Sequence, residues 1–198
     1  MIQTGLAKPE DTPKFAGRIF NESQRLITLV NDIIKISQLD EGTLPYSVEP
    51  VDVCALIRDI FDRLAVVAKK SAVSFYLEAE KSIILDTVKP ILDEILYNLC
   101  DNAVKYNCFG GSVTVTAEEN SGQITVSVAD TGIGIPQAHQ QRIFERFYRV
   151  DKSHSKEIGG TGLGLAIVKH GAAYLGAELK LKSTPETGST FTLIWNRT

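Results

Sequence analysis

The chain has 198 residues, of which 43% are hydrophobic, and a formal net charge of −3. This length allows one ordinary domain with a sizeable core and a helical appendage, which excludes a disordered or collagen-like chain. Charges of both signs are spread along the sequence, and no basic stripe suited to a phosphate backbone is present. We therefore expect no nucleic-acid partner.

The three cysteines, Cys54, Cys100 and Cys108, are odd in number and form no C-x-x-C pair, which favours a reducing, cytosolic compartment. The sequence contains no signal-peptide pattern and no apolar run approaching the ~20 residues that span a bilayer. We expect a soluble cytoplasmic piece that makes no membrane contact of its own, whatever a longer parent protein does.

A long helix is predicted over residues 13–40. Thr12 followed by Pro13 suits a helix start, with the threonine hydroxyl as N-cap, and Gly42 after Glu41 suits a stop. Between them one face recurs at alternating spacings of four and three and is apolar except at Glu22: Phe15, Ile19, Glu22, Leu26, Leu29, Ile33 and Ile36. The pattern fits either a core helix or half of a helical hairpin, and its position behind a turn at 5–11 favours the hairpin.

From Gly42 onward the periodicity changes, so we divide the chain into residues 1–42 and a compact domain over residues 43–198. The spacing of apolar residues predicts a mixture of helices and strands, an α+β domain, and the family resemblance described below implies that its sheet is mixed. In chain order we expect an extended stretch 43–51, a helix 53–69, strands 73–77 and 82–85, a helix 88–106, a hairpin of strands 112–118 and 123–130, a short helix 136–144, a polar loop 148–160, a helix 164–175, and strands 177–183 and 189–195.

The predicted helix 88–106 carries Asn98 and Asn102 four residues apart, so their amides share one face, with Lys105 and Tyr106 a turn beyond. An amide oxygen can ligate Mg²⁺, and a lysine can neutralise phosphate charge. Taken alone, such a pattern more often marks a solvated polar face.

A second motif, Asp130-Thr-Gly-Ile-Gly-Ile135, follows a predicted strand. Its two glycines, Gly132 and Gly134, would let the backbone approach a flat ligand closely, and Asp130 could accept a hydrogen bond from an exocyclic amine. A turn capped by the aspartate is an equally good interpretation of this motif by itself.

A third motif, Gly159-Gly-Thr-Gly-Leu-Gly-Leu165, runs directly into a predicted helix, whose N-terminal N–H groups can receive phosphate oxygens. It is no Walker A loop, because no Gly-Lys-Ser/Thr follows, and no strand precedes it as in dinucleotide-binding folds. A flexible linker remains an alternative.

Between these motifs lies Arg142-Ile-Phe-Glu-Arg-Phe-Tyr-Arg149. Its aromatic residues would usually belong to a core, and packing is the favoured interpretation of Phe144 and Phe147. Arg149 borders the polar loop, and its guanidinium suits phosphate.

The order of these motifs resembles the ATPase domain of histidine kinases, of the GHKL class with the Bergerat fold. The resemblance covers residues 43–198, with an N box at 98–107, a G1 box at 130–134, an F box at 144–147 and a G2 box at 160–165. It implies a two-layer α/β sandwich with helices on one face of the sheet, preceded by a long helix from a truncated hairpin.

The resemblance also implies site residues for ATP and Mg²⁺. By this likeness Asn102 coordinates Mg²⁺, Asn98 and Lys105 lie beside the phosphates, and Arg149 reaches the γ-phosphate, so that these four are the catalytic group. Asp130 receives the adenine amino group, and residues 137–161 form a lid. Further nucleotide contacts would come from Tyr106, Gly132, Gly134, Ile135, Phe147, Gly160, Thr161, Gly162, Leu163, Gly164 and Thr190.

The helix 13–40 is similar to the second helix of the family's dimerisation and phosphotransfer hairpin, which implies a homodimer through a four-helix bundle. The first helix, with its phosphoacceptor histidine, does not occur in this sequence, and we expect that this piece does not phosphorylate itself. His139, His154 and His170 are expected to be solvated or supporting residues. The resemblance further implies a response-regulator receiver domain as partner and a membrane-bound sensor as parent.

Two other functions remain open on the sequence. An ATPase of the same fold class would need a glutamate on helix 88–106 to activate water, and the position one turn before Asn102 is Asn98, a poor base, with Glu94 a further turn away. A non-catalytic, nucleotide-dependent interaction module is the second alternative.

Overall fold

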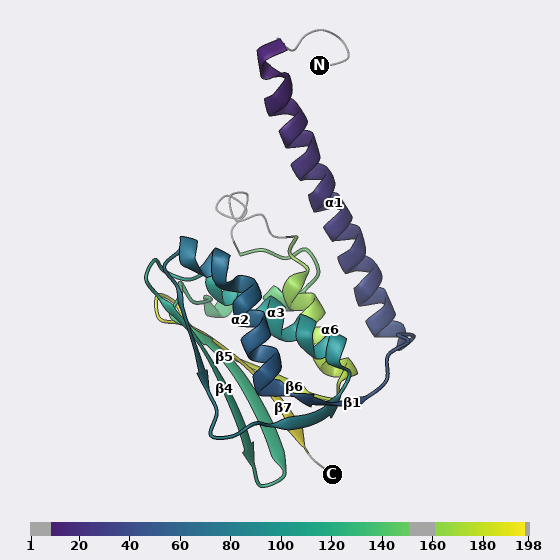
Figure 1. The fold of residues 1–198 in the computed structure, drawn as a ribbon, viewed down its shortest axis with the longest axis vertical. Coiled ribbons are helices and arrows are strands. Elements are labelled where there is room, and N and C mark those ends of the chain that lie inside the picture. Colours follow the sequence, from purple (N-terminus) through teal and green to yellow (C-terminus); the bar gives the residue numbers. More distant parts are fainter. Residues whose placement is uncertain (1–8, 151–160, 197–198) are drawn as a thin grey trace.

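The computed structural model describes residues 9–150 and 161–196. A 3₁₀ turn, η1 (Pro9–Asp11), leads into the long helix α1 (Thr12–Glu41), which projects from the rest of the chain (Figure 1). The predicted stop at Gly42 is confirmed: this residue has φ 63° and its N–H donates to the carbonyl oxygen of Gln38. The predicted N-cap is wrong, because Asp11, already helical at φ −87° and ψ −13°, takes that position without a side-chain cap bond.

The remaining elements follow the predicted order, with ends shifted by a few residues. The exception is the short helix expected over 136–144, which is split into a single turn of α-helix and a 3₁₀ turn. The elements are β1 (Glu49–Asp52), α2 (Val53–Lys70), β2 (Ser74–Glu78), β3 (Ile84–Thr87), α3 (Lys89–Lys105), β4 (Ser112–Asn120), β5 (Gln123–Asp130), α4 (Gln137–Gln140), η2 (Arg142–Phe144), α6 (Gly164–Tyr174), β6 (Glu178–Thr184) and β7 (Gly188–Asn196).

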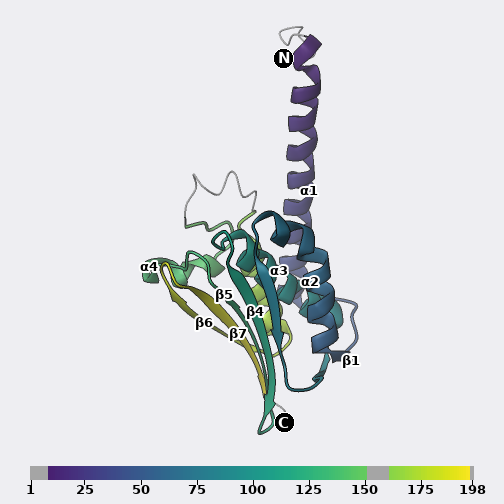
Figure 2. The ribbon, with the colours of Figure 1, turned by 60° about the vertical axis from the view of Figure 1, so that its left-hand side comes forward.

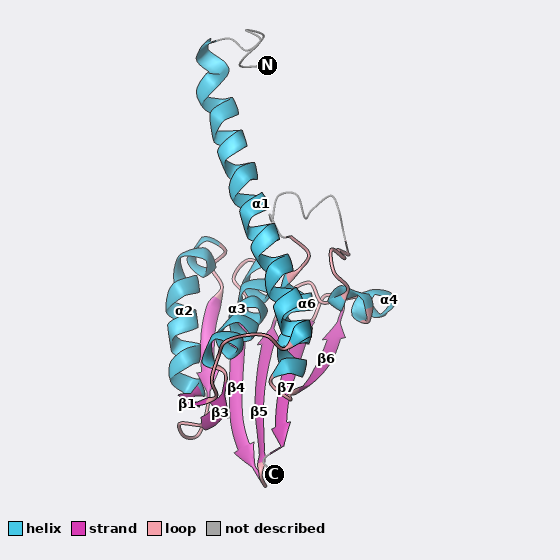
Figure 3. Cartoon of the chain, turned by 90° about the vertical axis from the view of Figure 1, so that its right-hand side faces the viewer, coloured by secondary structure: helices cyan, strands magenta, loops and turns pink. Residues whose placement is uncertain are grey.

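The main sheet has the strand order β2-β4-β5-β7-β6, with β2 parallel to β4 and the other neighbours antiparallel. Helices α2, α3 and α6 cover one face and leave the other open (Figures 2 and 3). Strand alternation explains this arrangement, because successive side chains of a strand point to opposite faces. Val113 and Val126 point to the helices and are fully buried. On the open face, Oγ of Ser127 lies 3.0 Å from Oγ1 of Thr192. The predicted two-layer sandwich is confirmed.

Helix α3 lies at the centre of the helical layer. Its side chains Leu92, Ile95 and Leu96 are completely buried, and each such side chain stabilises the fold by about 1.5–3 kcal/mol. The neighbouring α2 begins where the Asp52 carboxylate accepts the N–H of Ala55 at 3.0 Å, the usual N-cap arrangement. Packing against α2 and the sheet therefore fixes where the polar face of α3 points.

The C-terminal part of α1 packs on α6. Ile36, 1% exposed, is seated in an apolar cluster with Leu163, Ala166 and Ile167. The Lys35 ammonium lies 2.5 Å from the Glu94 carboxylate of α3, and Asp40 pairs with both Arg146 and His170. None of the helices in the described ranges has the length and apolarity needed to cross a bilayer.

The N-terminal part of α1 leaves the predicted apolar face uncovered. Ile19, Phe20, Leu26 and Val30 are each at least half exposed. Exposed apolar surface of this extent on one helix face is typical of a helix that packs against another chain.

Candidate active site

Helix α3 and the start of α6 meet at the two amides predicted from the sequence. A Cβ atom placed on Gly164 would lie 2.8 Å from Oδ1 of Asn98 and 3.9 Å from Nδ2 of Asn102. The Asn98 amide donates to the Glu94 carbonyl oxygen at 2.9 Å, whereas the Asn102 amide makes no hydrogen bond within residues 9–150 and 161–196. Asn102 is half-buried, so its amide is available to a ligand beside the glycine-led helix start.

The acidic glycine turn meets the C-terminal end of α3, one turn beyond Asn102. The N–H of Ile133 donates to the carbonyl oxygen of Tyr106 at 3.1 Å. A Cβ atom on Gly132 would lie only 2.2 Å from that same oxygen, so only glycine allows this approach. The turn therefore sits against the C-terminal end of the amide-bearing helix, as the family resemblance implies.

Asp130 is held in one orientation by backbone donors. Its Oδ1 accepts the N–H of Gly132 at 2.8 Å and the N–H of Ser189 at 3.3 Å. Burial raises the pKa of this carboxyl above its ordinary value, although the two N–H bonds work in the opposite direction. In the described part of the chain, Oδ2 has no hydrogen-bond partner and can accept one from an exocyclic amine.

The paired-Phe segment packs against the third motif. The N–H of Phe147 donates to the carbonyl oxygen of Gly162 at 3.0 Å, and both residues have positive φ angles, 65° and 76°. The packing prediction is confirmed for Phe144, which meets Phe191 edge-on with ring centroids 6.3 Å apart. It is wrong for Phe147, whose side chain is 55% exposed because the left-handed backbone turns it outward.

Lys105 and Arg149 are the two cationic side chains predicted to bind phosphate. The Lys105 ammonium pairs with the carboxylate of Asp101 on the same helix at 2.5 Å. An ammonium group has three N–H donors, so this pairing leaves two of them for a phosphate. Arg149 is half-buried just before residues 151–160. These residues, which include His154, Gly160 and part of the expected lid, lie outside the described residues.

Thr161, just before the helix start, is tied to α1. Its hydroxyl donates to Oδ2 of Asp32 at 3.1 Å and accepts the N–H of Leu163 at 3.3 Å. Burial raises the pKa of Asp32, while the bond from Thr161 lowers it. The third motif thus contacts the long helix as well as α3.

Gly134 and Ile135 face the hairpin of β6 and β7. A Cβ atom on Gly134, whose φ is 65°, would lie 2.0 Å from the carbonyl oxygen of Thr184. The N–H of Ile135 donates to Oγ of Ser183 at 2.8 Å. These contacts close the acidic turn against the end of the sheet.

The side chains of Leu163 and Thr190, two of the predicted nucleotide contacts, have other surroundings in the structure. Leu163 is fully buried and its side chain packs with Ile36 of α1, so it belongs to the helix contact. Thr190 pairs with Ala129 and, by strand alternation, points to the open face of the sheet. Its neighbour Ser189, which the sequence analysis overlooked, is buried beside Asp130.

The described histidines have protein partners. Nδ1 of His139 lies 2.5 Å from the Tyr148 hydroxyl, and His170 pairs with Asp40 of α1. The three cysteines are all free, two of them buried. Neither His139 nor His170 is placed by these contacts next to the amide-bearing face of α3, which agrees with a supporting role.

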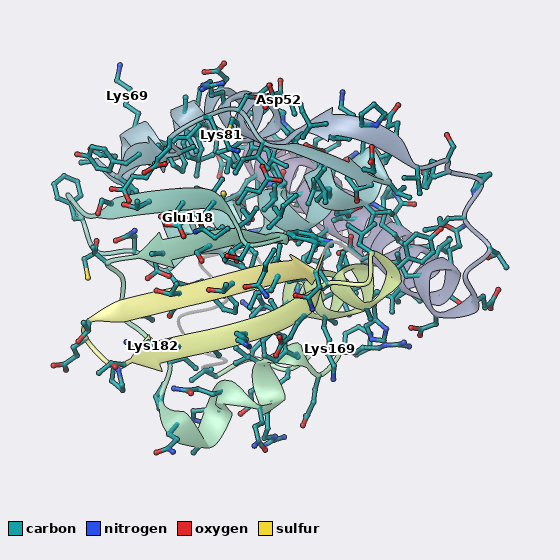
Figure 4. The ribbon with its side chains drawn as sticks, turned by 90° about the horizontal axis from the view of Figure 1, so that it is seen from below. Asp52, Lys69, Lys81, Glu118, Lys169 and Lys182 are labelled. Atoms are coloured by element: carbon teal, nitrogen blue, oxygen red, sulfur yellow. The ribbon has the colours of Figure 1, made fainter. Side chains whose placement is uncertain are left out.

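A half-open hollow of about 420 Å³ lies elsewhere, at the far end of β4 from the residues that meet Asp130. It is lined by residues 78–81, Ile83 and residues 116–120. Two of these lining residues, Lys81 and Glu118, are labelled in Figure 4. Its carboxylates, at Glu78, Glu80, Glu118 and Glu119, would repel a nucleotide triphosphate. The candidate site is therefore the convergence of the three motifs at the other end of the sheet.

Comparison with known proteins agrees with this geometry. Residues 87–198 match the family described as "Histidine kinase-, DNA gyrase B-, and HSP90-like ATPase". The chain is 38% identical over 185 residues to the sensor-like histidine kinase SenX3 of Mycolicibacterium smegmatis, which covers 93% of this chain and 48% of that protein. The chain thus spans about half the length of this curated relative.

Solved structures give the same result. Full-length ShkA, crystallised in complex with AMPPNP, is 28% identical and superposes with a TM-score of 0.77 over 92% of this chain and 38% of its own. Histidine kinase AdeS of Acinetobacter baumannii, at 21% identity, has the same fold, with a TM-score of 0.80 over 100% of this chain and 90% of its own. The chain belongs to the family of histidine kinase-, DNA gyrase B- and HSP90-like ATPases, and within it to the sensor histidine kinases.

Proposed function

We propose that this chain is the catalytic part of a protein histidine kinase, which transfers the γ-phosphoryl group of ATP to a histidine nitrogen and releases ADP. The single observation that carries this proposal is the convergence of three parts at the C-terminal half of α3: its polar face, the start of α6 beside Asn98 and Asn102, and the acidic turn against Tyr106. The acidic turn suits a base, the amides of α3 suit a metal-bound phosphate, and the start of α6 suits a triphosphate chain.

In this proposal the protein positions ATP and neutralises charge, as is usual in phosphoryl transfer. Asp130 accepts the amino group of adenine, and Gly132 and Gly134 allow the base to lie against the backbone. The N–H groups at the start of α6 receive phosphate oxygens, because the N-terminal end of a helix favours negative charge. Lys105 and Arg149 supply the positive charge.

A magnesium ion fits the site by the chemistry of its donors. Asn102 offers a half-buried amide with no hydrogen-bond partner in the described residues, and Asn98 offers its Oδ1 on the same face. Oxygen donors and phosphate oxygens are the ligands Mg²⁺ prefers, and the ion would neutralise charge on the phosphates. We assign Asn102 as its protein ligand.

The acceptor histidine, in this proposal, lies outside these 198 residues, so the chain by itself should not become labelled. We divide the chain at Gly42 into the second helix of a phosphotransfer hairpin, with preceding turn, and the catalytic domain. The exposed apolar face of α1 would pair with the missing helix and with a second copy. A response-regulator receiver domain would take the phosphoryl group, and the parent would be a membrane sensor whose catalytic part lies in the cytoplasm.

Hydrolysis of ATP by this chain is the less favoured function. The one glutamate on the polar side of α3, Glu94, pairs with Lys35 of α1 at 2.5 Å, so its carboxylate is already occupied by a partner. Steady hydrolysis that is lost in Glu94→Ala and kept in Asn98→Ala would favour this alternative.

Trans-phosphorylation tests the kinase proposal. A purified helical hairpin that carries an acceptor histidine and can pair with α1 should become labelled when mixed with this chain and Mg·ATP. The label should be absent when the chain is alone and when the acceptor histidine of the hairpin is replaced by glutamine. An unlabelled hairpin, despite measured ATP binding, would contradict kinase activity and favour a nucleotide-dependent interaction module.

A further inference from the structure

The hydroxyl of Ser183, near the end of β6, connects two segments that are far apart in the sequence. Its Oγ accepts the N–H of Ile135 at 2.8 Å, and it lies 3.1 Å from the carbonyl oxygen of Gly188 and 2.9 Å from Oγ of Ser189. A hydroxyl group donates one hydrogen bond and can accept two. Donation to Gly188 leaves both acceptor positions for Ile135 and Ser189, so every partner is satisfied.

Gln140 of α4 completes the same contact. Its Nε2 donates to the carbonyl oxygen of Ile135 at 2.9 Å and to the carbonyl oxygen of Ser183 at 3.0 Å. The amide group has two N–H bonds, and both are used here. Ile135 is thus held through its N–H by the Ser183 side chain and through its C=O by the Gln140 side chain.

The network reaches Asp130 from both directions. Along the chain, Ile135 ends the turn that Asp130 begins. Across the hairpin, Ser183 is the register partner of Ser189, whose N–H donates to Oδ1 of Asp130 at 3.3 Å. A third link, from the N–H of Glu186 to the carbonyl oxygen of Ile133 at 2.8 Å, fastens the hairpin tip to the same turn.

These contacts have one consequence for the carboxylate. Because Oδ1 is bound to two backbone N–H groups on separate segments, its direction depends on the distance between the turn and the hairpin. Ser183 and Gln140 hold that distance at Ile135, alongside the backbone bond from Glu186 to Ile133. The direction of Oδ2, the oxygen left to meet the base, depends on it in turn.

We propose that Ser183 and Gln140 are positioning residues for base recognition: by fastening the turn 130–135 to the hairpin of β6 and β7, they aim the free oxygen of Asp130 at the amino group of adenine. This inference rests on the proposed ATP site. It predicts that the two side chains affect discrimination between purine bases without contacting the nucleotide.

The test compares ATP with inosine triphosphate, which carries a carbonyl oxygen in place of the amino group. Wild-type chain should prefer ATP. In Ser183→Ala, ATP affinity should fall about fivefold, the effect of one hydrogen bond, while the affinity for inosine triphosphate stays unchanged. Ser183→Thr keeps the hydroxyl and should retain the preference for ATP. Gln140→Ala, at a position on the short helix α4, should reduce the same preference.

A merely structural role gives a different result. If Ser183→Ala lowered the affinities for ATP and inosine triphosphate by the same factor, or changed neither, the inference would be overturned. If Ser183→Ala did not fold, the same comparison would be made with Gln140→Ala. If wild-type chain bound no ATP, the proposed function itself would be overturned and this inference with it. Intact ATP binding with unchanged discrimination overturns only the inference.

Discussion

Replacing Asp130 with asparagine is expected to weaken ATP binding roughly a hundredfold while the fold stays intact. The asparagine carbonyl oxygen can take over the two N–H bonds of Oδ1, from Gly132 and Ser189. Its NH₂ group then replaces Oδ2 and presents a donor to the donating amino group of adenine. Loss of a charged hydrogen bond, with two donors left facing each other, should cost about 3 kcal/mol or roughly a hundredfold in affinity, measurable by calorimetric titration.

Stability provides the control for this variant. Because burial raises the pKa of Asp130, the folded state holds its proton more tightly than the unfolded chain does. The unfolding free energy therefore falls as pH rises from the ordinary aspartate pKa through the raised one. Asparagine does not ionise, so Asp130→Asn removes this fall in unfolding free energy. At neutral pH the variant should therefore unfold at a urea concentration no lower than that of wild type.

A matched substitution and an alternative one complete the comparison. Asp86→Asn changes the same residue type at an exposed position of β3 and should leave ATP affinity unchanged. Asp130→Ala is less informative, because it also removes the acceptor that joins Gly132 to Ser189. Unchanged ATP affinity in Asp130→Asn would show that adenine does not bind at this turn.

Replacing Asn102 with alanine is expected to remove the contribution of magnesium to nucleotide binding. The side chain makes no hydrogen bond within the described residues, so the substitution removes no hydrogen bond of this kind from the folded state. ATP should bind wild type more tightly with Mg²⁺ than with EDTA, and this difference should disappear in the variant. Transfer to a histidine-bearing hairpin should fall at least a hundredfold, since about 3 kcal/mol is a usual loss for one charge-stabilising group.

The control for this prediction is Asn120→Ala at the far end of β4, where the asparagine is exposed. This variant should keep both the magnesium effect and the transfer. If Asn102→Ala retained the full magnesium effect, another group would have to hold the ion.

The parts of the fold that depend on local patterns were predictable from the sequence. The hairpin of β4 and β5 follows from period-two alternation, and the stop of α1 follows from Gly42, the residue type that tolerates a positive φ. The juxtaposition of Asn98 and Asn102 needed only helical spacing. Their convergence with Asp130 and Gly162 followed from family resemblance, because spacing alone says nothing about distant segments.

The errors arose where one residue or one tertiary contact decides the outcome. Choosing Thr190 in place of Ser189 is a shift of one position, which in a strand moves the side chain to the opposite face. Leu163 looked like part of a phosphate loop, but its side chain is buried by α1, a helix that lies more than a hundred residues earlier. The Ser183 and Gln140 contacts likewise need the folded hairpin, and no sequence pattern indicates them.

The most direct test of the central claim is to map where a magnesium nucleotide binds. Amide signals of the wild-type chain should be followed by NMR as Mg·AMPPNP is added. If the three motifs share one nucleotide, the signals of Asn102, Asp130 and Gly162 should shift together with a single dissociation constant. Shifts confined to the acidic hollow around residues 78–81 and 116–120, or no shifts at all, would contradict the account.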